Sequence, residues 1–226
     1  VPNLQRYCDL VARAQTELGS SPKDAKKAAE EADAALPGHA APAVVIARAA
    51  LATGAIADAA AAFARARAIE PRSVEEPGAM HDLAVVLART GKRSEALAVY
   101  RALVPRVDLL GTTAARVSVL LEAAHLSMTL EGAGGAPTAA DLAKPRPAAH
   151  AAHASSRPHL DEAIAYLREA RHHPPTQLGG DVLLSLALVL ALGGARDEAD
   201  ATLAEAQRTG ARPSGGELAY LAAPED

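Results

Sequence analysis

The stretch LAVVLARTGKRSEALAVY, residues 83–100, contains two apolar segments with helical spacing on either side of one glycine. Leu83 and Leu87 lie one helical turn apart in the first segment, and a similar pattern runs through Tyr100 in the second. Gly91 stands between the two segments, and a glycine in this place is a turn signal. The stretch therefore predicts a pair of amphipathic helices joined by a short turn.

Two more segments of the chain repeat this pattern around Gly54 and Gly194. In all three copies an alanine precedes the glycine by seven residues, and apolar residues follow it by five, nine and twelve. These positions are Ala47, Ala59, Phe63 and Ala66; Ala84, Ala96, Tyr100 and Leu103; and Ala187, Ala199, Leu203 and Ala206. Acidic residues at 57–58, 94–95 and 197–198 mark the first turn of each second helix. The chain is thus built from repeated helix pairs.

Two further copies are less regular. Residues 4–37 contain a helix from Leu4, the turn GSSP, and a second alanine-rich helix that ends before Pro37. Residues 112–175 contain a long first helix and a second helix at 159–173. Gly91 and Gly194 lie 103 residues apart, about one repeat more than two steps of 34. The excess falls at 131–158, a segment rich in Ala, Gly, Pro and Ser, which is an insertion of either spacer or lid type.

These residues resemble the tetratricopeptide repeat (TPR) family, whose helix pairs of about 34 residues place small side chains where the helices cross. The resemblance implies an all-α, right-handed TPR-like α-solenoid of about five helix pairs with one long insertion loop. It forms a single domain over 1–226. The expected repeats are 4–37, 40–71, 77–108, 112–175 with the insertion 131–158, and 180–213, followed by a capping helix at 214–223.

Composition excludes several classes of function. The net charge is −4, with 23 basic and 27 acidic residues, so we expect no nucleic-acid partner. The longest apolar run, residues 182–192, is about half the length of a membrane span, so we expect no membrane insertion. One cysteine, Cys8, removes the usual argument for an oxidising compartment and slightly favours the cytoplasm over the periplasm. The abundance of alanine suggests high-GC coding and a bacterial source.

No motif for catalysis or for a cofactor is present. Five of the eight histidines fall between His150 and His173, but they lack a ligand set at fixed spacing. An alternative interpretation of these histidines is a metal-binding loop. His172 and His173 more simply end a helix, because protonated imidazoles interact favourably with the negative end of the helix dipole. No phosphate-binding glycine loop and no hydrolase elbow occurs. We therefore expect neither an enzyme nor a resident cofactor.

The TPR resemblance implies that the first helix of each pair lines a concave groove. By this resemblance, the partner-binding residues stand at fixed offsets before each turn glycine. They are Val44, Arg48, Leu51, His81, Val85, Arg89, Leu184, Leu188 and Leu192. The three leucines could instead pack against neighbouring helices, and the arginines could be ordinary solvated side chains.

The expected function is that of a non-enzymatic adaptor or scaffold that binds a protein or peptide, with apolar anchors and an acidic residue, in the groove. The alternative is a structural or regulatory subunit of a larger assembly, or the detached interaction module of a multidomain protein. The carboxylate clamp of chaperone-binding TPR domains is not expected, because Val44, Arg48 and Asp82 stand where its Lys/Asn set would be.

Overall fold

The structure is a computed structural model that describes residues 2–131, 157–173 and 176–212. The described residues form α-helices and short 3-10 turns and contain no strand. The chain divides into two compact units, Val1–Arg106 and Val107–Asp226. The expected insertion lies mostly outside the described residues, and the expected capping helix at 214–223 lies wholly outside them.

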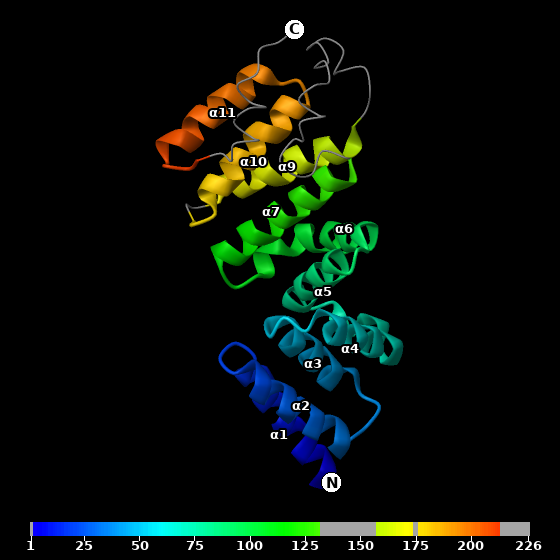
Figure 1. Cartoon of the computed structure of the whole chain (residues 1–226). Helices are drawn as coiled ribbons and strands as arrows, with labels where there is room; N and C mark the ends of the chain where they lie inside the picture. The colour runs from blue at the N-terminus through cyan, green and yellow to red at the C-terminus, as the bar shows by residue number, and fades with distance from the viewer. Residues whose placement is uncertain (1, 132–156, 174–175, 213–226) are drawn as a thin grey trace. The chain divides into compact units, whose positions relative to one another are not determined.

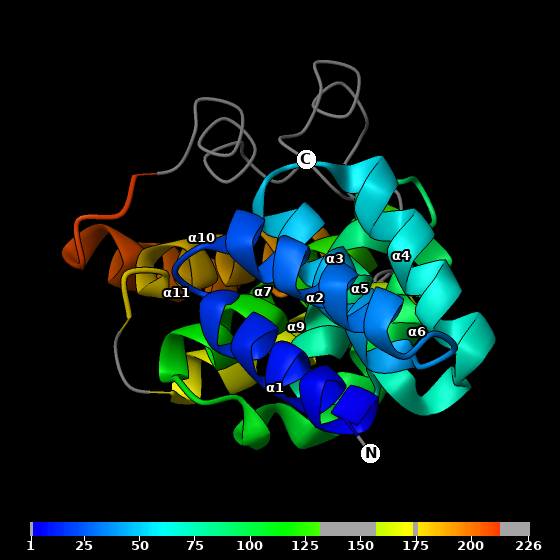
Figure 2. The same ribbon diagram turned by 90° about the horizontal axis from the view of Figure 1, so that it is seen from below.

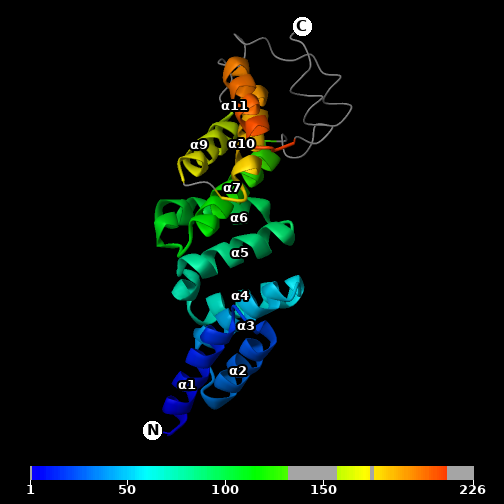
Figure 3. The same ribbon diagram turned by 90° about the vertical axis from the view of Figure 1, so that its left-hand side faces the viewer.

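Unit 1 consists of three helix pairs that follow one another along the chain (Figures 1 and 3). The pairs are α1 (Pro2–Glu17) with α2 (Pro22–Ala35), α3 (Ala40–Ala52) with α4 (Ile56–Ile69), and α5 (Pro77–Arg89) with α6 (Arg93–Leu103). The helices of a pair lie side by side, as Figure 2 shows for α1 and α2. A 3-10 turn, η1 (Pro71–Val74), occupies part of the longer connection that the 37-residue spacing from Gly54 to Gly91 requires.

Unit 2 consists of two helix pairs. They are α7 (Thr113–Leu130) with α9 (Pro158–His172), and α10 (Gly179–Leu192) with α11 (Arg196–Arg208). A second 3-10 turn, η2 (Val104–Leu109), covers the boundary between the units in sequence and was not expected. Thr112 caps α7, because its side chain accepts a hydrogen bond from Ala115 N at 3.1 Å. The all-α fold with five helix pairs is therefore confirmed.

The three aligned glycines have the same backbone conformation. Gly54, Gly91 and Gly194 have φ of +79°, +82° and +85°, the left-handed region in which a Cβ is disfavoured. In each turn the amide after the glycine donates to a carbonyl five residues back, at 2.9 Å in all three copies. This is the hydrogen bond of a helix C-cap that reverses the chain, and it explains why the repeat depends on glycine.

The aligned alanines lie where the helices of a pair cross. The positions seven before and five after each turn glycine are fully buried, with 0% exposure in all three copies. A larger side chain does not fit at such a crossing, so close helix packing fixes these positions as alanine. The aromatic position is filled by Phe63 in α4 and Tyr100 in α6, both at most 2% exposed.

Ion pairs on the second helices join neighbouring pairs within each unit. In unit 1, Arg65 of α4 contacts Asp33 of α2 at 3.0 Å. In unit 2, Arg168 of α9 contacts Glu198 of α11 at 2.8 Å, and the next turn repeats the contact between Arg171 and Glu205 at 2.6 Å. These pairs are partly exposed, so each contributes little to the free energy of unfolding. Their main effect is to align neighbouring second helices.

Candidate partner-binding site

The first helices of unit 1 are α1, α3 and α5, and α3 contacts both of the others. We call this surface the first-helix wall of unit 1. It carries six of the nine residues that the sequence assigns to partner binding: Val44, Arg48, Leu51, His81, Val85 and Arg89. Their positions differ sharply in exposure and in what they contact.

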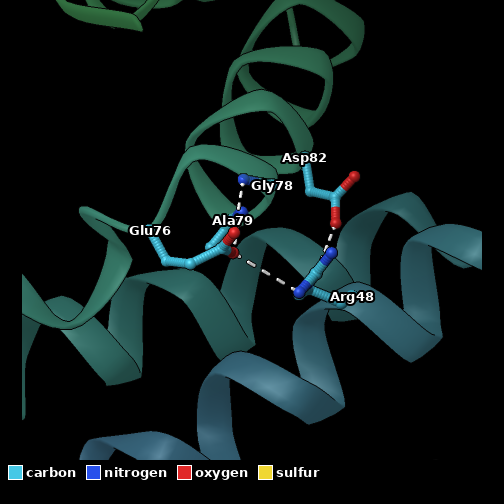
Figure 4. A network of polar contacts seen from close by, with 5 residues as sticks. All are labelled: Arg48, Glu76, Gly78, Ala79 and Asp82. Carbon is cyan, nitrogen blue, oxygen red and sulfur yellow. Dashed lines mark hydrogen bonds and ion pairs between the residues drawn. The ribbon is translucent and has the colours of Figure 1, made fainter. Parts of the chain in front are cut away.

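The side chain of Arg48 extends from α3 toward α5 and forms the main polar contact of this wall, with carboxylates at and before α5 (Figure 4). Its Nε donates to Asp82 Oδ2 at 2.7 Å, and its Nη1 lies 3.6 Å from Glu76 Oε2. The side chains of Arg48 and Asp82 are 30% and 25% exposed, so solvent screens this pair only in part. The guanidinium is therefore already balanced by carboxylates of the same chain.

Glu76 has a second role at the start of α5. Its two carboxylate oxygens accept hydrogen bonds from Gly78 N at 2.9 Å and Ala79 N at 2.8 Å, which makes it the N-cap of this helix (Figure 4). A carboxylate at a helix N-terminus is favoured by both these bonds and the helix dipole. Because Glu76 is held by α5, it approaches Arg48 in a fixed position.

A hollow of about 410 Å³ opens beside the Arg48–Asp82 pair. It lies within unit 1, between the end of α1, the last turns of α3 and the middle of α5. Its lining comprises Gln15, Leu18, Gly19, Arg48, Leu51, Ala52 and Asp82. We call it the α1–α3–α5 hollow. The structure thus brings two of the predicted residues, Arg48 and Leu51, together in one concave site.

The remaining predicted residues of unit 1 lie outside this hollow. Val44 is half-buried and packs against a small alanine cluster between α3 and α4. His81 is half-buried and its ring lies 6.3 Å from that of Tyr100 in α6, and Val85 is also half-buried. Arg89 is exposed at the end of α5, and within the described residues it makes no ion pair or side-chain hydrogen bond.

The three predicted leucines of unit 2 lie on α10. Leu184 and Leu188 are 8% and 4% exposed, and Leu184 packs against Leu183, Ala206 and Leu203. Leu192 is half-buried, and of the three it keeps the most side-chain surface for a partner. Packing within unit 2 thus accounts for most of the surface of the first two.

Asp82 and Ser185, which the sequence reasoning did not assign to the site, make equivalent contacts between consecutive first helices. His125 of α7 lies 2.8 Å from Ser185 of α10 (Nε2 to Oγ), so consecutive first helices are bridged in unit 2 as well. Asp82 and Ser185 each stand nine residues before their turn glycine. This offset was not among those used to assign the wall, and it would have identified both bridging residues.

The two ends of the insertion contact each other, and the C-terminal end also contacts α10. Arg157 contacts Glu131 at 3.7 Å (Nε to Oε1), and its Nη1 donates to Leu192 O at 2.9 Å. His159 N also donates to Glu131 Oε2, at 3.2 Å. The chain therefore leaves and re-enters the fold at neighbouring points. Whether the insertion is a spacer or a lid concerns residues outside those described.

The described part of the chain carries neither a metal cluster nor a membrane-spanning helix. No group of three or more His, Cys, Asp and Glu side chains there is placed to hold a metal ion. His150 and His153 lie outside the described residues, while α9 ends at His172 with His173 as its C-cap, as expected. Among the described helices, none has the length and apolar character that a membrane crossing needs.

Comparison with known proteins bears on the fold. No family model and no curated sequence matches the chain. Among solved structures, MamA residues 41 to the end from Desulfovibrio magneticus RS-1 superposes with a TM-score of 0.58 at 14% identity, over 92% of this chain and 95% of that one. The chain has a TPR-like fold.

Two further structures support the same conclusion. A MamA RS-1 ArsTM double mutant has a TM-score of 0.57 at 14% identity and covers 92% of this chain and 98% of its own. A kinesin-light-chain-type protein of Podosopora anserina with nearly identical TPR-like repeats has a TM-score of 0.52 at 17% identity, over 90% of this chain and 93% of its own. The TPR resemblance is therefore confirmed at the level of the fold.

Proposed function

We propose that the chain is a non-enzymatic adaptor that binds a peptide segment of another protein in the α1–α3–α5 hollow. The observation that supports this proposal most directly is that the concave site combines half-buried leucines with the Arg48–Asp82 ion pair. Apolar anchors surrounded by oriented polar groups are what peptide recognition requires. TPR-like folds commonly serve as protein-interaction modules, which supports the same function.

The exposed apolar surface supports an adaptor over a constitutive subunit. In the described part of the chain, the large apolar side chains that are well exposed are Leu4, Ile69 and Leu109. They belong to three different elements, α1, the end of α4 and η2, and no two of them share a helix. A permanent subunit interface is expected to present a continuous apolar patch instead.

Site-specific photo-crosslinking tests this proposal. A photoreactive amino acid at Ala52, an exposed residue at the rim of the hollow, should capture a partner from a lysate of the source organism. The matched control is the same amino acid at Ala61, which is exposed on the second helix of that pair. The capture at Ala52 should weaken when Leu51→Gln removes an apolar wall of the hollow without changing its charge.

Two outcomes would contradict the proposal. Equal capture from Ala52 and Ala61 would mean that the hollow is not the binding surface. Capture that is unchanged by Leu51→Gln but disappears when residues 133–155 are deleted would move recognition to the insertion. The deletion keeps Glu131 and Arg157, so the contacts that close the insertion at its base remain.

A further inference from the structure

We infer that the α1–α3–α5 hollow accepts a lysine or arginine side chain of the bound peptide. This inference rests on the proposed function, because it names the chemistry of one partner residue in the same site. It replaces the acidic partner residue that the sequence suggested. Three features of the described residues carry it: the charge balance, the free face of a carboxylate and the apolar walls.

The charge balance around Arg48 is negative. Two carboxylates, those of Asp82 and Glu76, lie within 4 Å of this single guanidinium, at 2.7 and 3.6 Å. Two carboxylates and one guanidinium have a formal charge of about −1 in sum. An acidic partner residue would add a further negative charge, whereas a basic residue would neutralise the cluster.

Asp82 lines the hollow and has one carboxylate oxygen that Arg48 does not use. One of its carboxylate oxygens accepts from Arg48, and the other is turned away from that contact (Figure 4). An ionised carboxylate has about four acceptor positions and can serve two cationic donors at once. Arg48 holds the carboxylate in place, so little side-chain freedom is lost when a second donor binds.

The walls of the hollow suit the stem of a long basic side chain. Leu18 and Leu51 are half-buried and line it, while the exposed Gln15 stands at its edge. Lysine and arginine lay their methylene groups on such apolar surface and keep the charged end in a polar environment. A volume of about 410 Å³ leaves room for this side chain together with part of the peptide backbone.

Selection from a random peptide library displayed on phage, against the purified full chain, tests the inference. We expect the selected peptides to share a lysine or arginine and to bind more weakly to the Leu51→Gln variant, which removes an apolar wall of the hollow without changing its charge. For a selected peptide, Asp82→Asn should weaken binding about three- to tenfold, as expected for one partly screened ion pair. Asp33→Asn is the matched control, because Asp33 pairs with Arg65 between second helices, and it should leave binding unchanged.

A double-mutant cycle separates direct contact from loss of structure. Replacing the peptide's basic residue by methionine should weaken binding to the wild type, but should have little further effect on the Asp82→Asn variant. Additive effects, or shared Asp, Glu, Asn or Gln residues in place of a basic one, would overturn the inference and leave the proposed function standing. Peptides that bind the Leu51→Gln variant as well as the wild type, or no selected peptide at all, would count against the proposed function itself.

Discussion

Asp82 lies 34 residues after Arg48, in the next helix pair of the chain, and its Oδ2 accepts a hydrogen bond from Arg48 Nε at 2.7 Å. The pair joins the first helices of two consecutive repeats on the first-helix wall of unit 1, where we propose that a partner binds. Arg48 is therefore a structural cation as well as a lining residue of the hollow. Reversing its charge would place three carboxylates together, so Arg48→Glu is a poor test of partner binding alone.

The Arg48–Asp82 pair should contribute measurably to stability. A double-mutant cycle with Arg48→Met and Asp82→Asn is expected to give a coupling free energy of about 1 kcal/mol, since both side chains are less than one-third exposed. Urea unfolding followed by circular dichroism measures it. The control cycle uses the Arg65–Asp33 pair, whose arginine is 46% exposed, and should give a smaller value. Equal couplings would show that burial does not strengthen the contact on the first-helix wall.

Gly91, the glycine in the turn between α5 and α6, should not tolerate a side chain. Gly91 has φ of +82°, so Gly91→Ala is expected to lower the free energy of unfolding by about 1–2 kcal/mol. A methyl group at either Gly91 or Gly111 would meet open space, but Gly111 lies outside the left-handed region, so Gly111→Ala should be neutral or slightly stabilising. Urea unfolding of the two variants measures the difference. A similar loss in both would mean that backbone conformation is not what selects glycine in this turn.

Most of the fold was predictable because the helix pair is a local structure. The turn glycine, the crossing alanines and the helical spacing all act within about 34 residues, and each leaves a periodic trace. The 3-10 turn η2 left no such trace, because a short irregular segment has no period. The positions seven before and five after each glycine are buried in all three copies, which explains why the alignment on Gly54, Gly91 and Gly194 succeeded.

The site was only partly predictable because its chemistry depends on contacts between repeats. The offsets placed Arg48 and Leu51 on the first-helix wall, where both line the hollow, but they gave no account of which carboxylates balance the charge of the arginine. Asp82 was noted only as a departure from the carboxylate clamp, and Glu76 not at all, since its approach to Arg48 depends on how α5 packs against α3. Likewise, the burial of Leu184 follows from packing against α11, which a helical offset does not report.

The pKa of Tyr7 should make alkaline stability depend on this residue. Burial, with smaller effects from Cys8 and Asp33, raises the pKa of the Tyr7 phenol above its usual value of about 10. Between the unfolded and the folded pKa the native state binds more protons, so stability is full below about pH 10 and falls as pH rises through this window. Tyr7→Phe should therefore lose less Tm than the wild type between pH 9 and 11. Parallel Tm curves for the two proteins would contradict this expectation.

The crossing alanines should resist enlargement. Ala59 of α4 is 0% exposed, so Ala59→Leu adds three carbon atoms to a packed crossing and is expected to cost about 1–3 kcal/mol of unfolding free energy. Ala61, two residues further along the same helix, is exposed, and Ala61→Leu should change stability by about 0.5 kcal/mol or less. Alanine and leucine have similar helix propensities, so the difference isolates packing at the crossing. Urea unfolding of both variants measures it, and equal stability would mean that the repeat tolerates a larger residue at the position where all three copies carry alanine.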